Sequence, residues 1–214
     1  MADDIALHGQ RSAWLCARLC AELGMPGAQI LDIARAAQTH DIGKYQLPTA
    51  LLEKPSALTP EEFETVKQHC VLGAQHLGRL AEDTADSSTV AVAVALSHHE
   101  WWNGSGYPFG LAGSAIPRSA RIVAVVDVFD ALISERPYKN AWSLDATLSY
   151  IAQRSGTQFE PDCVDALLAC AWDLPQTWRS DAQSASLDVL AQLASPRFVA
   201  PSPSNFVGLW PQDA

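Results

Sequence analysis

Histidine and aspartate residues recur along this 214-residue chain at nearly constant intervals. His40 and His69 are 29 residues apart, as are His69 and His98, and Asp127 follows His99 by 28 residues. An interval of this length is close to that of one helical hairpin. An antiparallel helical bundle would therefore bring these side chains to one level of its interior.

The rest of the sequence agrees with a helical bundle. Apolar residues repeat with helical periodicity nearly throughout, without the alternation typical of a strand. Gly24 and Pro26 predict the end of one helix, and Thr59, Pro60 and Glu62 predict the capped start of another. We therefore predict an all-α, multi-helix bundle. Its expected helices cover residues 3–23, 28–39, 48–54, 60–80 (with or without a break near residue 73), 89–97, 119–134, 143–155 and 161–171.

The composition changes at Trp172, after which proline, serine, alanine and glutamine become frequent. One short amphipathic segment, residues 186–194, stands out in this part of the chain. We predict one domain over residues 1–172 and an irregular C-terminal extension over residues 173–214.

Charge and composition exclude several classes of protein. A formal charge of −10 argues against binding to duplex nucleic acid, which needs a basic face. The sequence predicts no membrane span, and its start, Met-Ala-Asp-Asp-Ile, lacks the pattern of a signal peptide. The five cysteines are odd in number and form no Cys-x-x-Cys pair, so we expect reduced thiols in a cytoplasmic protein.

Residues 98–108 read His-His-Glu-Trp-Trp-Asn-Gly-Ser-Gly-Tyr-Pro and join two adjacent histidines to a glycine-rich loop. Neighbouring residues on a helix point about 100° apart, so these two imidazoles converge on one centre only at a helix end. The apolar run at residues 90–96 predicts such an end. Taken alone, the pair fits a metal site and a pair of buried structural histidines equally well.

Seven imidazole and carboxylate side chains, from at least five predicted helices, are candidates for a metal centre. Seven ligands exceed what one ion needs, which favours two divalent ions. The carboxylate of residue 41 is the best bridge, because each of its oxygens can reach one ion. The carboxylate of residue 127 lies in an apolar helix and needs a partner there, either a metal or a salt bridge. The candidates are His8, His40, Asp41, His69, His98, His99 and Asp127.

Two divalent ions about 3.5–4 Å apart clamp a phosphoryl group and supply hydroxide at neutral pH. Nitrogen and oxygen ligands without thiolate suit Mn, Fe, Ni or Zn, and do not choose among them. Lys44, Arg136 and Lys139 are cations suited to phosphate oxygens. The patterns of zincins, of α/β-hydrolases and of P-loop proteins are absent from the sequence.

Together, these motifs resemble the HD-GYP branch of the HD phosphohydrolase superfamily, whose members hydrolyse cyclic di-GMP. The resemblance covers about residues 4–168. It implies an all-α bundle of the HD-domain type and metal-dependent hydrolysis of a 3′–5′ phosphodiester, giving pGpG, GMP or both. The segments that carry it are 40–44 (His-Asp-Ile-Gly-Lys), His69, 98–108, 127–132 (Asp-Val-Phe-Asp-Ala-Leu) and 136–139 (Arg-Pro-Tyr-Lys).

The resemblance implies two groups of metal ligands that share Asp41. Fe or Mn is expected first, with Ni, Zn or Mg as alternatives. Three-metal members carry a glutamate four residues before the first histidine, where this chain has the shorter Asp4, so a third metal is left open. The first group would be His8, His40, Asp41 and Asp127, and the second Asp41, His69, His98 and His99.

The resemblance also implies roles for the groups around the metals. A hydroxide between the ions, with Asp41 as the bridging carboxylate, would attack phosphorus. Lys44 would contact the scissile phosphate or help the leaving oxygen, and Arg136 and Lys139 would bind the other phosphate region. The pocket would be shaped by the GYP loop, which consists of Gly106, Tyr107 and Pro108.

Partners and rival functions follow from the same resemblance. The GYP loop would receive a diguanylate cyclase or an adaptor protein, and family members usually carry a sensory domain upstream. Asn103 stands where an aspartate is frequent, and we expect it to alter hydrogen bonding in the loop. Two alternatives stay open: a catalytically weak sensor of cyclic dinucleotides or interaction module, and an HD phosphohydrolase of another cyclic nucleotide.

Overall fold

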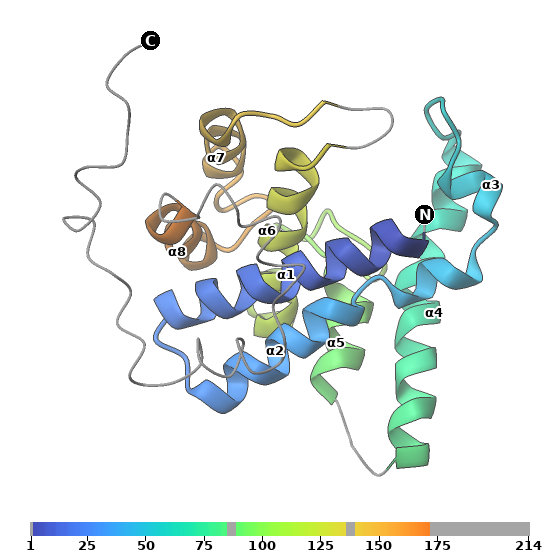
Figure 1. The fold of residues 1–214 in the computed structure, drawn as a ribbon, viewed down its shortest axis with the longest axis horizontal. Helices are drawn as coiled ribbons and strands as arrows, with labels where there is room; N and C mark the ends of the chain where they lie inside the picture. Colours follow the sequence, from blue (N-terminus) through green and yellow to red (C-terminus); the bar gives the residue numbers. More distant parts are fainter. Residues whose placement is uncertain (1, 85–88, 136–139, 172–214) are drawn as a thin grey trace.

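The computed structural model describes residues 2–84, 89–135 and 140–171, with the side chains of residues 2–4 and 82–84 left out of the description. Within these ranges all regular secondary structure is helical, which confirms the all-α prediction (Figure 1). The elements are α1 (Ala2–Glu22), α2 (Gly27–Thr39), η1 (Ile42–Gln46), α3 (Thr49–Leu52), α4 (Pro60–Thr84), α5 (Thr89–Ser97), η2 (Gly113–Ala115), α6 (Arg118–Ile133), α7 (Leu144–Ala152) and α8 (Pro161–Cys170), where η1 and η2 are short 3₁₀ helices.

Local signals in the sequence account for the ends of several helices. At the start of α4, the Glu62 backbone N–H donates to the Thr59 hydroxyl over 3.2 Å, and the Thr59 N–H donates to the Glu62 carboxylate over 2.7 Å. This reciprocal pair is the predicted capping box. At α7, the Ser143 hydroxyl accepts from the Ala146 N–H in the same way. Each cap satisfies backbone donors that the first turn of a helix leaves unpaired.

The break near Gly73 that the sequence left open is absent, because α4 runs unbroken from Pro60 to Thr84. Gly73 serves close packing instead. A side chain at Gly43 in η1 would lie 2.0 Å from the His69 carbonyl oxygen and 2.6 Å from the Gly73 nitrogen, so no side chain fits there. The two glycines therefore let η1 lie directly against the middle of α4.

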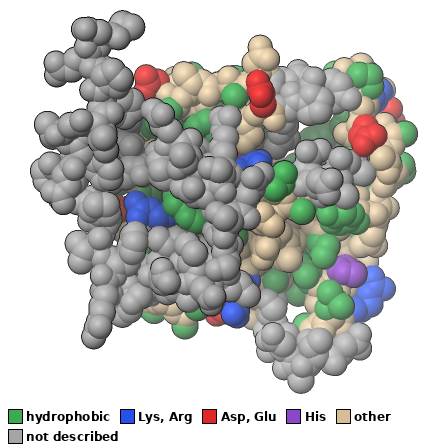
Figure 2. Space-filling view, viewed as in Figure 1, with side chains coloured by type: hydrophobic (Ala, Val, Ile, Leu, Met, Phe, Trp, Pro, Cys, Tyr) green, Lys and Arg blue, Asp and Glu red, His purple; other side chains and the backbone are tan. Residues whose placement is uncertain are grey.

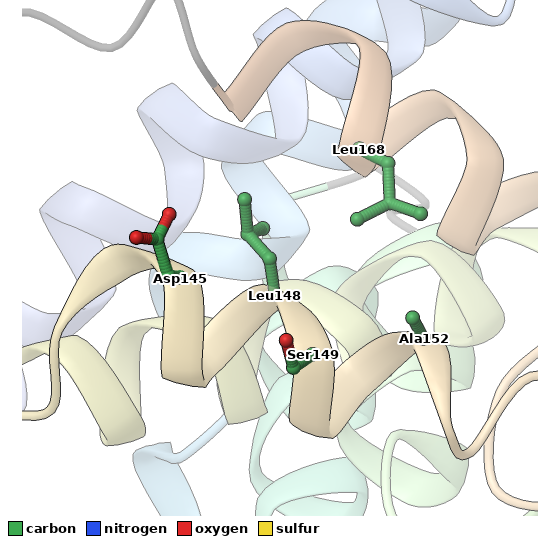
Figure 3. A pocket seen from close by; sticks show the side chains of 5 residues that line it. All are labelled: Asp145, Leu148, Ser149, Ala152 and Leu168. Atoms are coloured by element: carbon green, nitrogen blue, oxygen red, sulfur yellow. The ribbon is translucent and has the colours of Figure 1, made fainter.

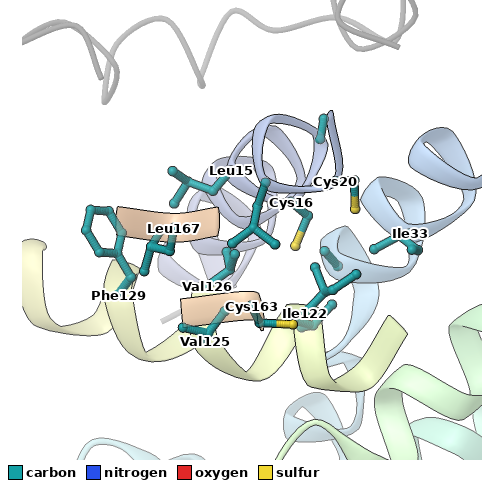
Figure 4. Close-up of a cluster of buried hydrophobic side chains, with 14 of the residues drawn as sticks. Leu15, Cys16, Cys20, Ile33, Ile122, Val125, Val126, Phe129, Cys163 and Leu167 are labelled. Atoms are coloured by element: carbon teal, nitrogen blue, oxygen red, sulfur yellow. The ribbon is translucent and has the colours of Figure 1, made fainter. Parts of the chain in front are cut away.

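The apolar core lies between α1, α2, α6 and α8 (Figure 4). Leu15, Ile122, Phe129 and Leu167 from three of these helices are almost fully buried, and Ile33 adds the contribution of α2. Burying one such side chain stabilises the fold by about 1.5–3 kcal/mol. This core holds α1 and α6 at a fixed distance, with α4 and η1 packed beside it.

Among the described helices, none combines the length and the apolar composition that crossing a bilayer requires. On the face shown in Figure 2, the described lysine and arginine side chains are scattered rather than gathered into a basic surface. The predicted extension, residues 173–214, lies outside the described residues, so the division into a domain and an extension stays a prediction.

Candidate metal centre

The seven predicted ligands meet in the interior of the bundle. Ligand atoms of six of them form two groups, each with members within 4.8 Å of one another, and the carboxylate of Asp41 belongs to both. The carboxylate of Asp127 lies beside the first group. The side chains come from different elements, so only the tertiary fold brings them together. They are His8 on α1, His40 and Asp41 between α2 and η1, His69 on α4, His98 and His99 just after α5, and Asp127 on α6.

The first group surrounds the Nε2 atoms of two buried histidines. Nε2 of His8 lies 3.3 Å from Nε2 of His40 and 3.1 Å from Oδ1 of Asp127. Nε2 of His40 lies 3.8 Å from the same Asp127 oxygen and 3.6 Å from Oδ2 of Asp41. Two imidazoles and two carboxylates thus face a common point.

The second group repeats this arrangement on the other side of Asp41. Nε2 of His69 lies 3.3 Å from Nε2 of His98. Oδ1 of Asp41 lies 3.4 Å from Nε2 of His69 and 3.8 Å from Nε2 of His98. The His99 ring completes the group, with its centroid 4.1 Å from that of His98 and 5.1 Å from that of His69.

Asp41 is placed as a bridge. Its Oδ2 faces the first group and accepts from the Lys44 ammonium over 2.5 Å. Its Oδ1 faces the second group, is buried, and has no hydrogen-bond partner among the described residues. A buried carboxylate oxygen without a donor is costly in free energy unless something cationic satisfies it. The residues present therefore fit a metal ion at this position.

The hydrogen bonds of the histidines indicate which ring nitrogens are free. Nδ1 of His40, His69 and His98 lies 2.7, 2.7 and 3.0 Å from a backbone carbonyl oxygen of the preceding turn. A carbonyl oxygen only accepts, so Nδ1 carries the proton and Nε2 presents a lone pair. The lone pairs of His69 and His98 then face each other across 3.3 Å, an arrangement that a cation between them would stabilise.

Burial keeps most of these imidazoles neutral. It lowers the pKa of His40 and of His69 to about 4, although the Asp41 carboxylate acts in the opposite direction. It also lowers the pKa of His99 well below the usual range of histidine. Neutral imidazole is the form that binds metals, so these three side chains are ready ligands at neutral pH.

For the two carboxylates and for His8, charged neighbours outweigh the effect of burial on the pKa. Burial acts to raise the pKa of Asp41 and of Asp127. The Lys44 ammonium and the neighbouring imidazoles nevertheless hold the pKa of Asp41 well below its ordinary value, and the hydrogen bond from His8 does the same for Asp127. Burial acts to lower the pKa of His8, but its hydrogen bonds with Asp127 and Asp130 raise it to about 9. In the metal-free centre His8 therefore keeps a proton between two carboxylates, where a metal would compete for Nε2.

Among the described residues, the Cys70 thiol also lies near the predicted ligands and would bind a metal if it were ionised. Its Sγ lies 3.5 Å from Nε2 of His69. Burial raises the pKa of Cys70, so it stays a protonated thiol, and thiolate is the form that binds metals. The donor set remains nitrogen and oxygen, as the sequence indicated.

Asp130 and Arg11 belong to the centre, although the sequence reasoning gave neither a role. Asp130 is fully buried and accepts from Nδ1 of His8 over 2.6 Å. Arg11 donates to both oxygens of Asp130, over 2.7 and 2.9 Å. A carboxylate behind a ligating histidine orients the ring and sets its tautomer. The signal was present: Arg11 follows His8 by one helical turn on α1, just as Asp130 follows Asp127 on α6.

The loop after His99 is built around a second buried acid, Glu100, whose role the sequence did not indicate. Its carboxylate accepts from the backbone N–H groups of Phe109 over 2.8 Å and of Leu111 over 3.0 Å. A side chain at Gly106 would lie 2.2 Å from the Trp101 nitrogen, so only glycine fits that position. Glu100 and Gly106 together hold the GYP loop against the end of α5.

The predicted substrate-binding residues of the GYP loop lie at the edge of the centre. The Tyr107 ring lies against the His99 ring, with 4.8 Å between the centroids, and the peptide bond to Pro108 is cis. The side-chain oxygen of Asn103 accepts from the Ser105 N–H and hydroxyl, two bonds that an aspartate would also accept, so the expected change in hydrogen bonding stays a prediction. The loop thus brings one aromatic side chain, Tyr107, directly against a predicted ligand.

Three other predicted site residues cannot be placed. Arg136 and Lys139 lie outside the described residues, and so does the side chain of Asp4. Lys44 is described, with about a quarter of its side chain exposed beside Asp41. Lys44 is therefore the predicted phosphate-binding cation that the structure brings to the centre.

A separate pocket of about 390 Å³ lies between α7 and α8 (Figure 3). None of the predicted ligands lines it, and its walls carry a single carboxylate and a single hydroxyl beside apolar groups. It offers no cluster of metal ligands or cations, so the chemistry places the candidate site at the histidines instead. Its lining residues are Asp145, Leu148, Ser149, Ala152 and Leu168.

Comparison with known sequences gives concordant results. The HD domain family model matches residues 4–163. The chain is similar to a cyclic di-GMP phosphodiesterase from Thermotoga maritima, 41% identical over 81% of this chain and 46% of that protein. It is also similar to 3′3′-cGAMP-specific phosphodiesterase 2 from Vibrio cholerae, 38% identical over 78% of this chain and 31% of that protein. The chain thus spans less than half the length of either relative.

The fold agrees with a solved structure. Bd1817, an HDG"Y"P protein from Bdellovibrio bacteriovorus, superposes with a TM-score of 0.63. The match covers 78% of this chain and 52% of that chain, at 21% sequence identity. At that identity the likeness concerns the fold, and it places the helices described above in a known arrangement.

Proposed function

The chain belongs to the HD domain family, in its HD-GYP branch, and from this premise we propose that it is a metal-dependent phosphodiesterase that hydrolyses cyclic di-GMP. The observation that carries the proposal is the placement of Asp41, whose two oxygens face two separate groups of imidazoles. A shared carboxylate between two nitrogen-rich groups is what a pair of ions acting on one phosphoryl group requires. The similarity to a cyclic di-GMP phosphodiesterase supports the choice of substrate.

The ligands would divide at Asp41, which would belong to both sites. Fe or Mn is proposed ahead of Ni, Zn or Mg. Whether Asp4, near the start of α1, binds a third ion is left open. Bound ions would supply hydroxide at neutral pH and neutralise charge on the phosphoryl group. The proposed sets are His8, His40, Asp41 and Asp127 for one ion, and Asp41, His69, His98 and His99 for the other.

The chain's own residues would prepare this site and hold the substrate. Asp130 and Arg11 fix the His8 ring through Nδ1, which leaves Nε2 directed at the first site. The Lys44 ammonium lies beside Asp41 with part of its side chain exposed, where it would contact an oxygen of the scissile phosphate or the leaving oxygen. Arg136 and Lys139 are proposed to bind the second phosphate.

The partners are part of the proposal. Beyond the cyclic dinucleotide, we propose that the GYP loop receives a diguanylate cyclase or an adaptor protein. We also propose a sensory domain in the full protein, since the two relatives are each more than twice as long as the part that this chain matches. The five cysteines are free and buried, which supports a reducing, cytoplasmic setting.

A second candidate function is hydrolysis of 3′3′-cGAMP, favoured by the similarity to a phosphodiesterase named for that substrate. The decisive experiment incubates the chain anaerobically with Mn²⁺ or Fe²⁺ and each dinucleotide, and separates the products by chromatography. We expect pGpG or GMP from cyclic di-GMP, and no product from the His40→Ala, Asp41→Ala double variant. If the metal-loaded wild-type chain binds cyclic di-GMP but forms no product, the protein is a sensor rather than an enzyme.

A further inference from the structure

Two side chains of α4, one turn apart, form an aromatic corner with Tyr107 of the GYP loop. The rings of Phe63 and Tyr107 are nearly perpendicular, at 82°, with 6.0 Å between their centroids. The Lys67 ammonium lies 4.9 Å from the Phe63 centroid and 5.4 Å from the Tyr107 centroid. We call Phe63, Lys67 and Tyr107 the aromatic corner. Its rings and cation are brought together from two elements, and the metal ligands do not include any of the three.

The aromatic corner borders the more open side of the metal centre. His40, His69 and His98 are each about 1% exposed, whereas His99 is only partly buried, and the Tyr107 ring lies against it. The Tyr107 ring links Phe63 to this ligand, because its centroid lies 4.8 Å from that of His99 and 6.0 Å from that of Phe63. A nucleobase lies one ribose away from its phosphate, so a phosphate at the metals would bring a base close to Phe63.

The chemistry of the aromatic corner suits a purine base. The Phe63 side chain is 43% exposed, so its ring can stack on a base, and such stacking accepts any base. An ammonium group donates to the two acceptors, O6 and N7, that guanine presents on one edge. Adenine replaces O6 with an amino donor, so it offers the ammonium only one acceptor there.

Glu64 is the present partner of the Lys67 ammonium, at 2.6 Å, and its side chain is 66% exposed. The Lys67 side chain is 24% exposed, so water still reaches the pair from the Glu64 side and weakens it by screening. A base edge can therefore replace or share this partner, since the ammonium has three donors.

We propose that the aromatic corner binds one purine base of the cyclic dinucleotide, with Phe63 stacking on the base and Lys67 selecting guanine over adenine. This inference rests on the proposed function for the identity of the ligand. It assigns specificity to side chains of α4, outside the metal-binding motifs.

The test measures binding and turnover separately on the full chain. Calorimetry on the Mn²⁺-loaded chain with phosphorothioate analogues of cyclic di-GMP and cyclic di-AMP, which resist hydrolysis, gives the Kd for each ligand. We expect Lys67→Met to weaken cyclic di-GMP binding about tenfold with little effect on cyclic di-AMP. Phe63→Leu should weaken both ligands, and the matched control Lys54→Met, which removes a lysine paired with Glu62 instead, should change neither.

The outcomes separate this inference from the proposed function. A wild-type chain without guanine preference, a Lys67→Met variant that keeps the preference, or a chain that binds neither ligand would overturn the base site. Turnover is then measured with Mn²⁺. A guanine preference that depends on Lys67, together with no turnover, would leave the base site standing and overturn the phosphodiesterase alone.

Discussion

Asp130 holds His8 from behind, although it is not itself a predicted metal ligand. It is fully buried and receives four hydrogen bonds, one from His8, two from Arg11 and one from the Ser134 hydroxyl. The ring of His8 has no other described donor or acceptor at Nδ1, so its orientation depends on this carboxylate. At the scale of single residues, the predicted ligands are therefore only part of the centre.

Replacing Asp130 by asparagine should weaken metal binding at the first group by about 10- to 100-fold, the usual effect of losing such a partner. The variant should also lose about 3 kcal/mol of stability, because the partly buried Arg11 loses its charge partner. Calorimetric titration with Mn²⁺ and urea unfolding measure the two effects. Glu160→Gln is the matched control: it breaks the buried pair with Arg121, remote from the ligands, and should lower stability while metal affinity stays unchanged.

The histidine pKa values predict how stability depends on pH without metal. His40 and His69 have folded-state pKa values of about 4, below the unfolded value of 6.5. The unfolded chain therefore binds protons that the folded chain excludes, and stability is lost as pH falls from 6.5 toward 4. The pKa of His8 is raised to about 9, so its contribution is lost as pH rises from 6.5 through 9.

Urea unfolding in EDTA at pH 5, 6.5 and 8.5 should thus show the highest stability near pH 6.5. On either side of this maximum, the free energy of unfolding changes by about 1.4 kcal/mol per pH unit for each proton exchanged. His76→Gln, a half-buried position outside the ligand groups, should leave the profile unchanged. Stability that rises steadily from pH 5 to 8.5 would contradict the assignment of the raised pKa to His8.

At the scale of elements, the contact between η1 and α4 positions Asp41 relative to His69. Gly43 makes this contact possible, because its backbone touches the His69 carbonyl where a side chain would need space. Helix α4 in turn carries both His69 and the aromatic corner. A short 3₁₀ helix and one long α-helix therefore hold the shared carboxylate, a ligand of the second group and the proposed base site.

Gly43→Ala should push η1 away from α4, since the new methyl group would lie 2.0 Å from the His69 oxygen. Overpacking of this kind costs about 1–3 kcal/mol, and here it also separates Asp41 from the second group. We expect lower thermal stability and the loss of one bound Mn²⁺ per chain, measured by metal analysis after dialysis. Gly78→Ala in the same helix meets no atom within 4 Å and should be neutral or stabilising, by up to about 1 kcal/mol.

At the scale of the whole molecule, the candidate centre joins both parts of the bundle. The apolar core is built mainly by α1, α2, α6 and α8, and α5 adds Ala91 and Val94 to it, while α4 and η1 pack at the side. The ligands come from both parts, so bound ions would link them. Without such ions, the negative charge of the buried carboxylates and the lone pairs of the neutral imidazoles face one another with too little positive charge between them.

Metal binding should therefore stabilise the entire fold. Mn²⁺ at 100 times its Kd should add about 2.7 kcal/mol to the free energy of unfolding for each occupied site, which a thermal scan detects as a higher Tm. EDTA should reverse the shift, and titration should saturate at two ions per chain. A shift of equal size in the His40→Ala, Asp41→Ala double variant would mean that Mn²⁺ acts elsewhere.

The sequence by itself predicted the all-α class, most of the helices and the seven side chains that meet in the interior. Apolar periodicity, caps and ligand spacing are properties of short segments or of regular intervals, so they are readable without coordinates. The roles of the seven as metal ligands, and those of Arg136 and Lys139, stay predictions.

Only the tertiary structure decided what surrounds these side chains. The contact between His8 and Asp130 joins residues 122 positions apart, and no local pattern encodes such a pairing. The course of α4 through Gly73 was likewise decided by the tertiary structure. Gly73 lies inside the helix and packs closely against Gly43 of η1, so it does not end the helix. Local preferences determine which elements form, whereas the few ångströms between elements depend on the packing of the whole chain.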